Sequence, residues 1–271
     1  MLKDLVEGTH PYSARLKKAQ LPMVITGAET LSRPDGESIQ NYINQLAQQT
    51  NLINEKEGWN GINVLQTEAS KIGALDLGIT TKPTNENAKV VFILGADNFR
   101  HEDIPANAFV IYVGHTGDEG VYYADLILPA SSYLEKMGTY VNLDGRVQTT
   151  RAASTAPGFA RDDWMILRAL SEELNCPLPY DSLDEVRTRL AEYAPHLVRY
   201  DALEPNGFEK LAHATNSKTH LSTAILTDAV DNFYMTDSIS KNSHIMARCT
   251  RELNPQKQTN FKQWVNNWYT H

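Results

Sequence analysis

Two groups of polar side chains have the residue types and the spacing that acid–base chemistry uses. His115 is followed closely by Asp118 and Glu119, which together could form a catalytic cluster of one imidazole and two carboxylates. Glu135 directly precedes Lys136, and such a pair could exchange a proton. General acid–base catalysis needs these partners within hydrogen-bonding distance and with perturbed pKa values, and the sequence shows neither. We therefore interpret the first group as a solvated loop edge and the second as a charge-paired anchor.

Two pairs of neighbouring carboxylates raise the question of a cation site. They are Asp162-Asp163 and Glu172-Glu173. Their expected places at the start and on the exposed side of a helix favour capping and solvation instead. Arg146 follows a turn glycine, and we expect it to fix a hairpin by hydrogen bonds rather than to bind an anion.

The metal-binding residue types are sparse. Only two cysteines occur, Cys176 and Cys249, whereas an iron–sulfur cluster usually takes four thiolates. The eight histidines are scattered and form no zinc-type pair with an acid. We therefore predict no catalytic, cofactor-binding or metal-binding residue in this chain. Both cysteines are expected to be packed thiols, without a disulfide between them.

Short apolar runs predict a parallel sheet that would position any such site. Residues 90–94, 109–113 and 126–128 are continuous apolar runs followed by glycine or a turn residue, and residues 23–25 are a fourth run. This pattern is typical of parallel strands buried on both faces. Helical spacing lies between them, first at Ile39, Ile43 and Leu46 and then at Ile62, Leu65, Ala69 and Ile72. The alternation indicates an open α/β sheet flanked by helices.

Glycines follow several of these strands. They are Gly27, Gly95 with Ala96 and Asp97, and Gly114 with His115. Ligands of open α/β sheets bind at the carboxyl ends of the strands, so these loops resemble a cofactor cradle. Glycine is equally the residue by which a strand turns out of a sheet. No GxGxxG or GxxxxGK[ST] motif is present, which disfavours a nicotinamide or P-loop site.

The second half of the chain predicts a hairpin and helices. Asp144-Gly145 favours a tight turn between strands at 140–142 and 146–149, after a glycine-rich loop at 114–124.

A helix is expected from Asp162 with Trp164, Leu167, Leu170 and Leu174 on one face. Ser182–Glu185 is a capping box for a second helix with Val186, Leu190 and Tyr193 inward. Residues 201–236 are expected to be irregular. A helix is expected near Ser238 with Ile245, Met246, Cys249 and Leu253, and a terminal aromatic helix with Phe261, Trp264, Val265 and Trp268.

Composition excludes two classes of partner. The net charge of −8 and the pI near 5.5 argue against binding to a nucleic-acid backbone, which requires clustered basic residues. No apolar run approaches the roughly 20 residues that cross a bilayer. We therefore expect no direct membrane insertion, so that any membrane association goes through other chains.

One long segment resembles a known family. Residues 124–148, ADLILPASSYLEKMGTYVNLDGRVQ, are similar to a segment near the C-terminal end of the molybdopterin-oxidoreductase fold, where ADxILP is followed by EKxGTxxNxxGRxQ. Further motifs occur in the family's order: HPYS at 10–13, LPMV at 21–24, 59–78, PGFARDDW at 157–164, LPYD at 178–181 and DNFYMTDSIS at 231–240. Together they resemble the C-terminal part of the largest iron–sulfur subunit of mitochondrial respiratory complex I.

The resemblance implies an organisation and a function. It implies a partial molybdopterin-oxidoreductase-like α/β domain at 1–158, a small helical domain at 159–200, and an irregular tail with docking helices at 201–271. The chain would be a structural fragment that supports NADH-to-ubiquinone electron transfer on the matrix side of the mitochondrial inner membrane. Iron–sulfur clusters would belong to a companion N-terminal fragment, and other peripheral-arm subunits would be further partners.

Two alternatives stay open at this point. The chain could be the cofactor-binding part of a true molybdopterin oxidoreductase, which bound molybdenum or tungsten with pterin would reveal. It could also be a nucleotide-binding α/β module, which a co-purified nucleotide would reveal.

Overall fold

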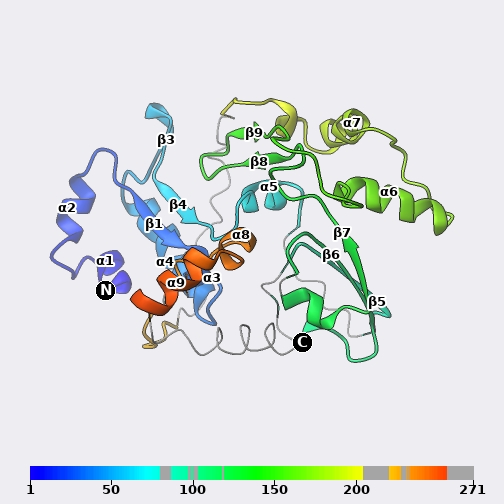
Figure 1. The fold of residues 1–271 in the computed structure, drawn as a ribbon. Coiled ribbons are helices and arrows are strands. Elements are labelled where there is room, and N and C mark those ends of the chain that lie inside the picture. Colours follow the sequence, from blue (N-terminus) through cyan, green and yellow to red (C-terminus); the bar gives the residue numbers. More distant parts are fainter. Residues whose placement is uncertain are drawn as a thin grey trace. The chain divides into compact units, whose positions relative to one another are not determined.

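The computed structural model describes residues 1–79, 87–96, 99, 103–117, 119–203, 220–226, 230 and 232–254. These residues form two compact units, each composed of separate stretches of chain (Figure 1). Unit 1 comprises Met1–Ala74, Val141–Val147 and Asp201–Ala229, and unit 2 comprises Leu75–Tyr140, Gln148–Tyr200 and Val230–His271. The domain boundaries expected after residues 158 and 200 stay a prediction.

Unit 1 is built on a parallel pair of strands. Its elements are α1 (Leu2–Glu7), α2 (Ser13–Lys18), β1 (Val24–Gly27), α3 (Ala28–Leu31), α4 (Gly36–Gln49), β2 (Ile53–Asn54), η1 (Glu55–Glu57), β3 (Trp59–Asn60) and β4 (Ile62–Leu65). Strand β1 pairs in parallel with β4, and β2 pairs antiparallel with β3. The core consists of Val6, Tyr42, Leu46, Ala47 and Leu52, against which Val24 and Ile62 pack. The apolar face predicted for α4 is therefore confirmed at Leu46.

One predicted helix is wrong. Ile62 and Leu65 were expected on a helical face together with Ala69 and Ile72, but they lie in β4, and the helix α5 (Lys71–Asp76) begins only afterwards. The β-branched side chains of Ile62 and Val64 favour an extended backbone. Pairing with β1, in the register Val24 to Ile62, decides the conformation.

Unit 2 contains the main parallel sheet. Strands β5 (Val90–Leu94), β6 (Phe109–Gly114) and β7 (Leu126–Pro129) run parallel in the order β5-β6-β7 (Figure 1). The three strands and the α/β fold class predicted from the apolar runs are confirmed. The expected burial on both faces is wrong for β5 and β7, which keep exposed residues, and the fourth expected strand, β1, lies in a separate sheet with β4. The loop expected between β6 and β7 contains a short 3-10 helix, η3 (Glu119–Tyr123).

The two faces of this sheet have different coverings. Ile93, Val110 and Tyr112 pack with Phe99, Ile104, Val121 and Ala124, which come from the β5–β6 and β6–β7 connections. On the opposite face, Ile111, Val113 and Ala130 pack with Leu128 and with Ile166 of α6. Val113 is almost fully buried.

The predicted hairpin is present. Its strands are β8 (Thr139–Val141) and β9 (Val147–Thr149), and Gly145 adopts a φ of 81° in the turn between them. The Asn142 side-chain oxygen accepts from the backbone N–H groups of Asp144, at 3.1 Å, and Arg146, at 2.9 Å. Glycine is favoured at the turn because a left-handed φ strains most other residues.

Helices follow the hairpin in unit 2. They are α6 (Asp163–Glu173), α7 (Leu183–Tyr193), the 3-10 helix η4 (Pro195–Val198), α8 (Ser238–Lys241) and α9 (His244–Leu253). The predicted capping box of α7 is confirmed, with both Ser182 and Glu185 making their bonds. Tyr193 was predicted to point inward but is 76% exposed, with the Arg189 guanidinium 5.5 Å from its ring centre.

The helix expected near Ser238 is divided in two. The hydroxyl of Ser243 accepts from the N–H of Met246 and caps α9, so the chain restarts a helix there. The predicted terminal aromatic helix lies outside the described residues. Among the described residues, no helix is both long and apolar enough to span a bilayer.

Candidate functional site

The carboxyl edge of the unit 2 sheet is where the sequence placed a cofactor cradle. Gly95 and Gly114 lie at the ends of the adjacent strands β5 and β6, and the Gly95 N–H donates to the Val113 carbonyl at 2.7 Å. Gly27 ends β1 in unit 1, so it belongs to a different sheet. Asp97 lies outside the described residues. The structure therefore brings together only part of the predicted cradle.

A tyrosine occupies the space beside these glycines. A Cβ atom on Gly114 would overlap the ring of Tyr112, and one on Gly120 would lie 2.5 Å from it. Tyr112 itself is almost completely buried. The two glycines thus make room for the protein's own side chain beside the end of β6.

His115 lies exposed directly after β6. Its Nε2 is 3.2 Å from the hydroxyl of Ser238, the first residue of α8. Asp118 and the side chain of Glu119 lie outside the part of the chain that the structure describes, so the predicted cluster is not tested. The exposure of His115 agrees with its interpretation as a loop edge.

The loop after β7 is tied to the start of α6. Lys136 forms an ion pair with Asp163, and the Ser131 hydroxyl donates to Asp162 Oδ1 at 2.9 Å. Glu135 instead accepts from the backbone N–H of Ser132 at 2.9 Å. The interpretation of Glu135 and Lys136 as a charge-paired anchor for the hairpin is therefore wrong, because Lys136 pairs with Asp163 of α6 and Glu135 binds a backbone N–H. Asp162 occupies the N-cap position of α6 without making a capping bond, so the predicted capping role is wrong, because Ser131 engages its carboxylate.

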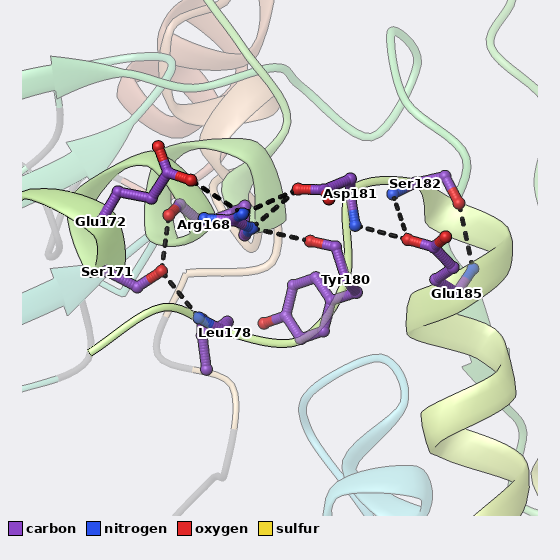
Figure 2. Close-up of polar contacts among 8 residues, drawn as sticks. All are labelled: Arg168, Ser171, Glu172, Leu178, Tyr180, Asp181, Ser182 and Glu185. Carbon is purple, nitrogen blue, oxygen red and sulfur yellow. Dashed lines mark hydrogen bonds and ion pairs between the residues drawn. The ribbon is translucent and has the colours of Figure 1, made fainter. Parts of the chain in front are cut away.

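A polar network joins α6 to the start of α7, and the sequence reasoning missed its centre. Figure 2 shows Arg168 reaching the chain ahead of α7. Its Nε donates to the Tyr180 carbonyl at 2.9 Å and to Asp181 Oδ1 at 3.0 Å, while its Nη2 is 2.9 Å from Glu172 Oε1. The only available signal was the i,i+4 spacing of Arg168 and Glu172. Burial opposes the charge, but the two carboxylates raise the pKa of Arg168.

Ser171 completes this network. Its hydroxyl donates to the Arg168 carbonyl at 2.6 Å and accepts from the Leu178 N–H at 3.0 Å, as Figure 2 shows. Glu172 is thus part of an ion pair, whereas Glu173 remains on the exposed side of α6 as expected. The network has a structural role, because the side chains of Arg168 and Ser171 bond to residues of α6 and of the α6–α7 connection.

Unit 1 has an open pocket of ≈ 620 Å³ next to the end of β1. Asp35, with a side chain only 6% exposed, accepts from Arg33 Nε at 2.8 Å and from the Ser222 N–H at 2.9 Å. The Arg33 bond and then the Ser222 bond lower the pKa of the Asp35 carboxyl. Arg33 also donates to the Ala224 carbonyl at 3.3 Å. These bonds hold residues 220–226 at the rim of the pocket.

The hairpin arginine has a similar structural role. Arg146 Nη1 donates to the carbonyl and to the carboxylate of Asp201 at 2.7 and 2.9 Å. The prediction that Arg146 fixes the hairpin by hydrogen bonds is therefore confirmed.

The cysteines differ from the prediction. Both are free thiols, but Cys176 is exposed on the α6–α7 connection, and only Cys249 on α9 is partly buried. The packed-thiol expectation is wrong for Cys176, which follows Asn175 with its positive φ of 53° at the end of α6. Within the described residues, no group of three His, Cys, Asp or Glu side chains could hold a metal ion.

Comparison with known proteins decides the family. A model described as molybdopterin oxidoreductase matches residues 1–173. The chain belongs to the molybdopterin oxidoreductase family. A second model, which describes the C-terminal region of an NADH-ubiquinone oxidoreductase subunit, matches residues 202–249.

Individual relatives of this chain are named as subunits of NADH-ubiquinone oxidoreductase. It is 47% identical over 87% of its length to the mitochondrial NADH-ubiquinone oxidoreductase 78 kDa subunit of Candida albicans. It is 42% identical over 93% of its length to the mitochondrial NADH dehydrogenase [ubiquinone] iron-sulfur protein 1 of Solanum tuberosum, and 42% identical over 92% to the NADH-ubiquinone oxidoreductase 75 kDa subunit of Reclinomonas americana. The chain covers 34%, 34% and 37% of these relatives, about a third of each. The resemblance stated from the motifs is confirmed.

Proposed function

We propose that this chain forms the C-terminal part of the large iron–sulfur subunit of NADH:ubiquinone oxidoreductase, respiratory complex I, on the matrix side of the mitochondrial inner membrane. The observation that carries the proposal is the identity of 42–47% to such subunits across about nine tenths of the chain. The match of residues 202–249 to a model of the C-terminal region of an NADH-ubiquinone oxidoreductase subunit supports the same placement.

We further propose that its role there is structural. The iron–sulfur clusters would be carried by the rest of the subunit, which corresponds to the two thirds of the relatives that this chain does not match. We call this part the cluster-bearing remainder. In support, Lys136, Arg146 and Arg168 each bond to a carboxylate of the same chain, an arrangement that fixes loops and helices. The chain would thereby stabilise the peripheral arm through which electrons pass from NADH toward ubiquinone.

An affinity tag on the chain tests this proposal in its native membranes. After mild solubilisation, we expect the tagged chain to migrate on a native gel with in-gel NADH dehydrogenase activity and with the cluster-bearing remainder of the subunit. Depleting the chain should reduce the amount of assembled, NADH-oxidising complex. Migration of the chain apart from all NADH dehydrogenase activity would refute the proposal.

The family assignment itself favours one alternative, a working molybdopterin oxidoreductase completed by another polypeptide. Metal and pterin analysis of the same purified assembly separates the two. We expect iron and acid-labile sulfide without stoichiometric molybdenum, tungsten or pterin. Stoichiometric molybdenum with extractable pterin would replace our proposal by the alternative.

A further inference from the structure

One half of the unit 2 sheet has an open apolar face. Val90, Phe92 and Leu94 alternate along β5, and Phe109 is the β6 neighbour of Val90 in the parallel register, so all four side chains share one face. Each of these residues is between 38% and 49% exposed. We refer to these four residues as the β5 face. Their neighbours on β6, Ile111 and Val113, are buried on the same side of the sheet.

The described core residues of the connections between the strands lie on the other side of the sheet from the β5 face. Consecutive right-handed crossovers that advance in one direction across a parallel sheet lie on the same side of it. Phe99 and Ile104 of the first connection and Val121 and Ala124 of the second all pack with Tyr112 and its neighbours, on the opposite side. On the near side, Ile166 of α6 packs over Ile111, Val113 and Leu128, which belong to β6 and β7.

The sequence of β5 is that of a central strand. Its residues, VVFIL, are apolar on both faces and include none of the charged or proline residues with which natural edge strands avoid unwanted pairing. Within the described residues, however, β5 pairs only with β6. The apolar composition of β5 therefore predicts a further strand beside it. The open apolar face predicts a helix that packs over it.

We propose that the β5 face and the outer edge of β5 receive a strand and its covering helix from the cluster-bearing remainder of the subunit. This inference rests on the proposed function and names the surface through which the two parts join. The matched relatives are about three times as long as this chain, which provides the source of such a segment. A second copy fits less well, because four partly exposed side chains offer only a fraction of the roughly 800 Å² per partner that a specific dimer buries.

Site-specific photocrosslinking tests the inference in the assembled protein. The photoreactive amino acid benzoylphenylalanine replaces Phe92, and in a matched control it replaces Phe159, which is 88% exposed on the connection ahead of α6. After illumination, mass spectrometry identifies the crosslinked peptides. We expect the Phe92 probe to crosslink to an apolar segment of the cluster-bearing remainder, and the Phe159 probe not to crosslink to that segment.

Other results overturn the inference. These are a crosslink from Phe92 to a second copy of the chain, to a segment of the same chain, or to a different subunit, or no crosslink at all. The inference and the proposed function fail differently. If the chain migrates with NADH dehydrogenase activity but the Phe92 probe gives any of these results, only the docking surface is wrong. If the chain never enters that complex, the proposed function is wrong and the inference falls with it.

A charge substitution provides a second measurement. Phe92→Asp places a carboxylate on the β5 face, and we expect it to reduce incorporation of the chain into the complex at least tenfold, since an unpaired charge is costly to bury. Phe159→Asp should leave incorporation within about twofold. Because Phe92 is already partly exposed, the isolated Phe92→Asp chain should keep the circular dichroism of the parent chain. Equal incorporation of the two variants would contradict the proposal.

Discussion

Arg168 on α6 and Asp181 ahead of α7 are joined by two contacts, with Nε and Nη2 of the arginine 3.0 and 2.8 Å from the same carboxylate oxygen. Nε also donates to the Tyr180 carbonyl, so one planar guanidinium holds both the backbone and the side chain of the connection. Of the residues in α6 and α7, only the polar Ser171 is buried, so polar bonds rather than a buried apolar core link the two helices.

Arg168→Lys should loosen the helical pair although it keeps the charge. A lysine ammonium cannot reproduce the planar fork that reaches Tyr180, Asp181 and Glu172 at once. We expect faster hydrogen exchange at residues 178–182, measured by mass spectrometry on the assembled protein. Arg189→Lys is the control, because Arg189 pairs with Glu192 on an exposed helix surface. Unchanged exchange in Arg168→Lys would show that the network does not hold the connection.

Residues 220–226 should detach from unit 1 in acid. The pKa of Asp35 in the folded protein is lowered from its ordinary 3.8 by the Arg33 and Ser222 bonds. The stabilisation is therefore complete above pH 3.8 and is lost as the pH falls through the lower folded pKa. The NMR signal of the Ser222 amide should move with the Asp35 titration.

Asp35→Asn removes the charge at every pH and should weaken the Ser222 contact already at neutral pH. Glu29→Gln, at the same pocket, serves as the control. A Ser222 signal that does not respond to Asp35 titration would contradict this coupling.

Ser182→Ala should destabilise α7 by about 1 kcal/mol, the typical cost of losing an N-cap. The Ser182 hydroxyl accepts from the Glu185 N–H at 3.2 Å, and Glu185 accepts in return from the Ser182 N–H, also at 3.2 Å. Residue-resolved hydrogen exchange in the first turn of α7 measures the loss. Ser182→Asp should retain most of the stability, so equal losses in both variants would exclude capping as the cause.

Gly114→Ala should cost about 1–3 kcal/mol, because the added methyl group would overlap the ring of Tyr112. Tyr112→Leu shortens that side chain, and the double variant should be more stable than the sum of the two single losses predicts. Denaturant unfolding measures all three variants. Gly95→Ala is the contrast: its Cβ would meet no neighbour, so its loss comes from the φ of 58° and Tyr112→Leu should not relieve it. Strict additivity of Gly114→Ala and Tyr112→Leu would rule out the overlap.

Elements that are specified by a short stretch of sequence were predicted correctly. The strand β5 and the capping box at Ser182 were legible because an unbroken apolar run and a four-residue spacing each specify a structure without reference to distant residues. Ile62 was placed wrongly because its helical spacing is also compatible with a strand, and only pairing with Val24, far away in sequence, distinguishes them.

The candidate site shows the same division. The hydrogen-bonding role of Arg146 was predicted from its place after the turn, but its side-chain partner, Asp201, lies far away in sequence and was not predicted. Arg168 was missed because its main partner, Asp181, lies beyond a connection whose path the sequence does not specify. The role of Gly114 likewise depends on the orientation of the Tyr112 ring, which a residue pattern cannot give.

The exposed thiol of Cys176 offers a site for chemical labelling. Cys176 is exposed to solvent, whereas Cys249 is partly covered, so a maleimide dye should label Cys176 first. A fluorophore there would sit on the connection held by Arg168, and its polarisation would report the opening of the helical pair in real time. The same accessibility makes a reducing agent necessary during purification, since two such thiols on separate molecules can join by oxidation.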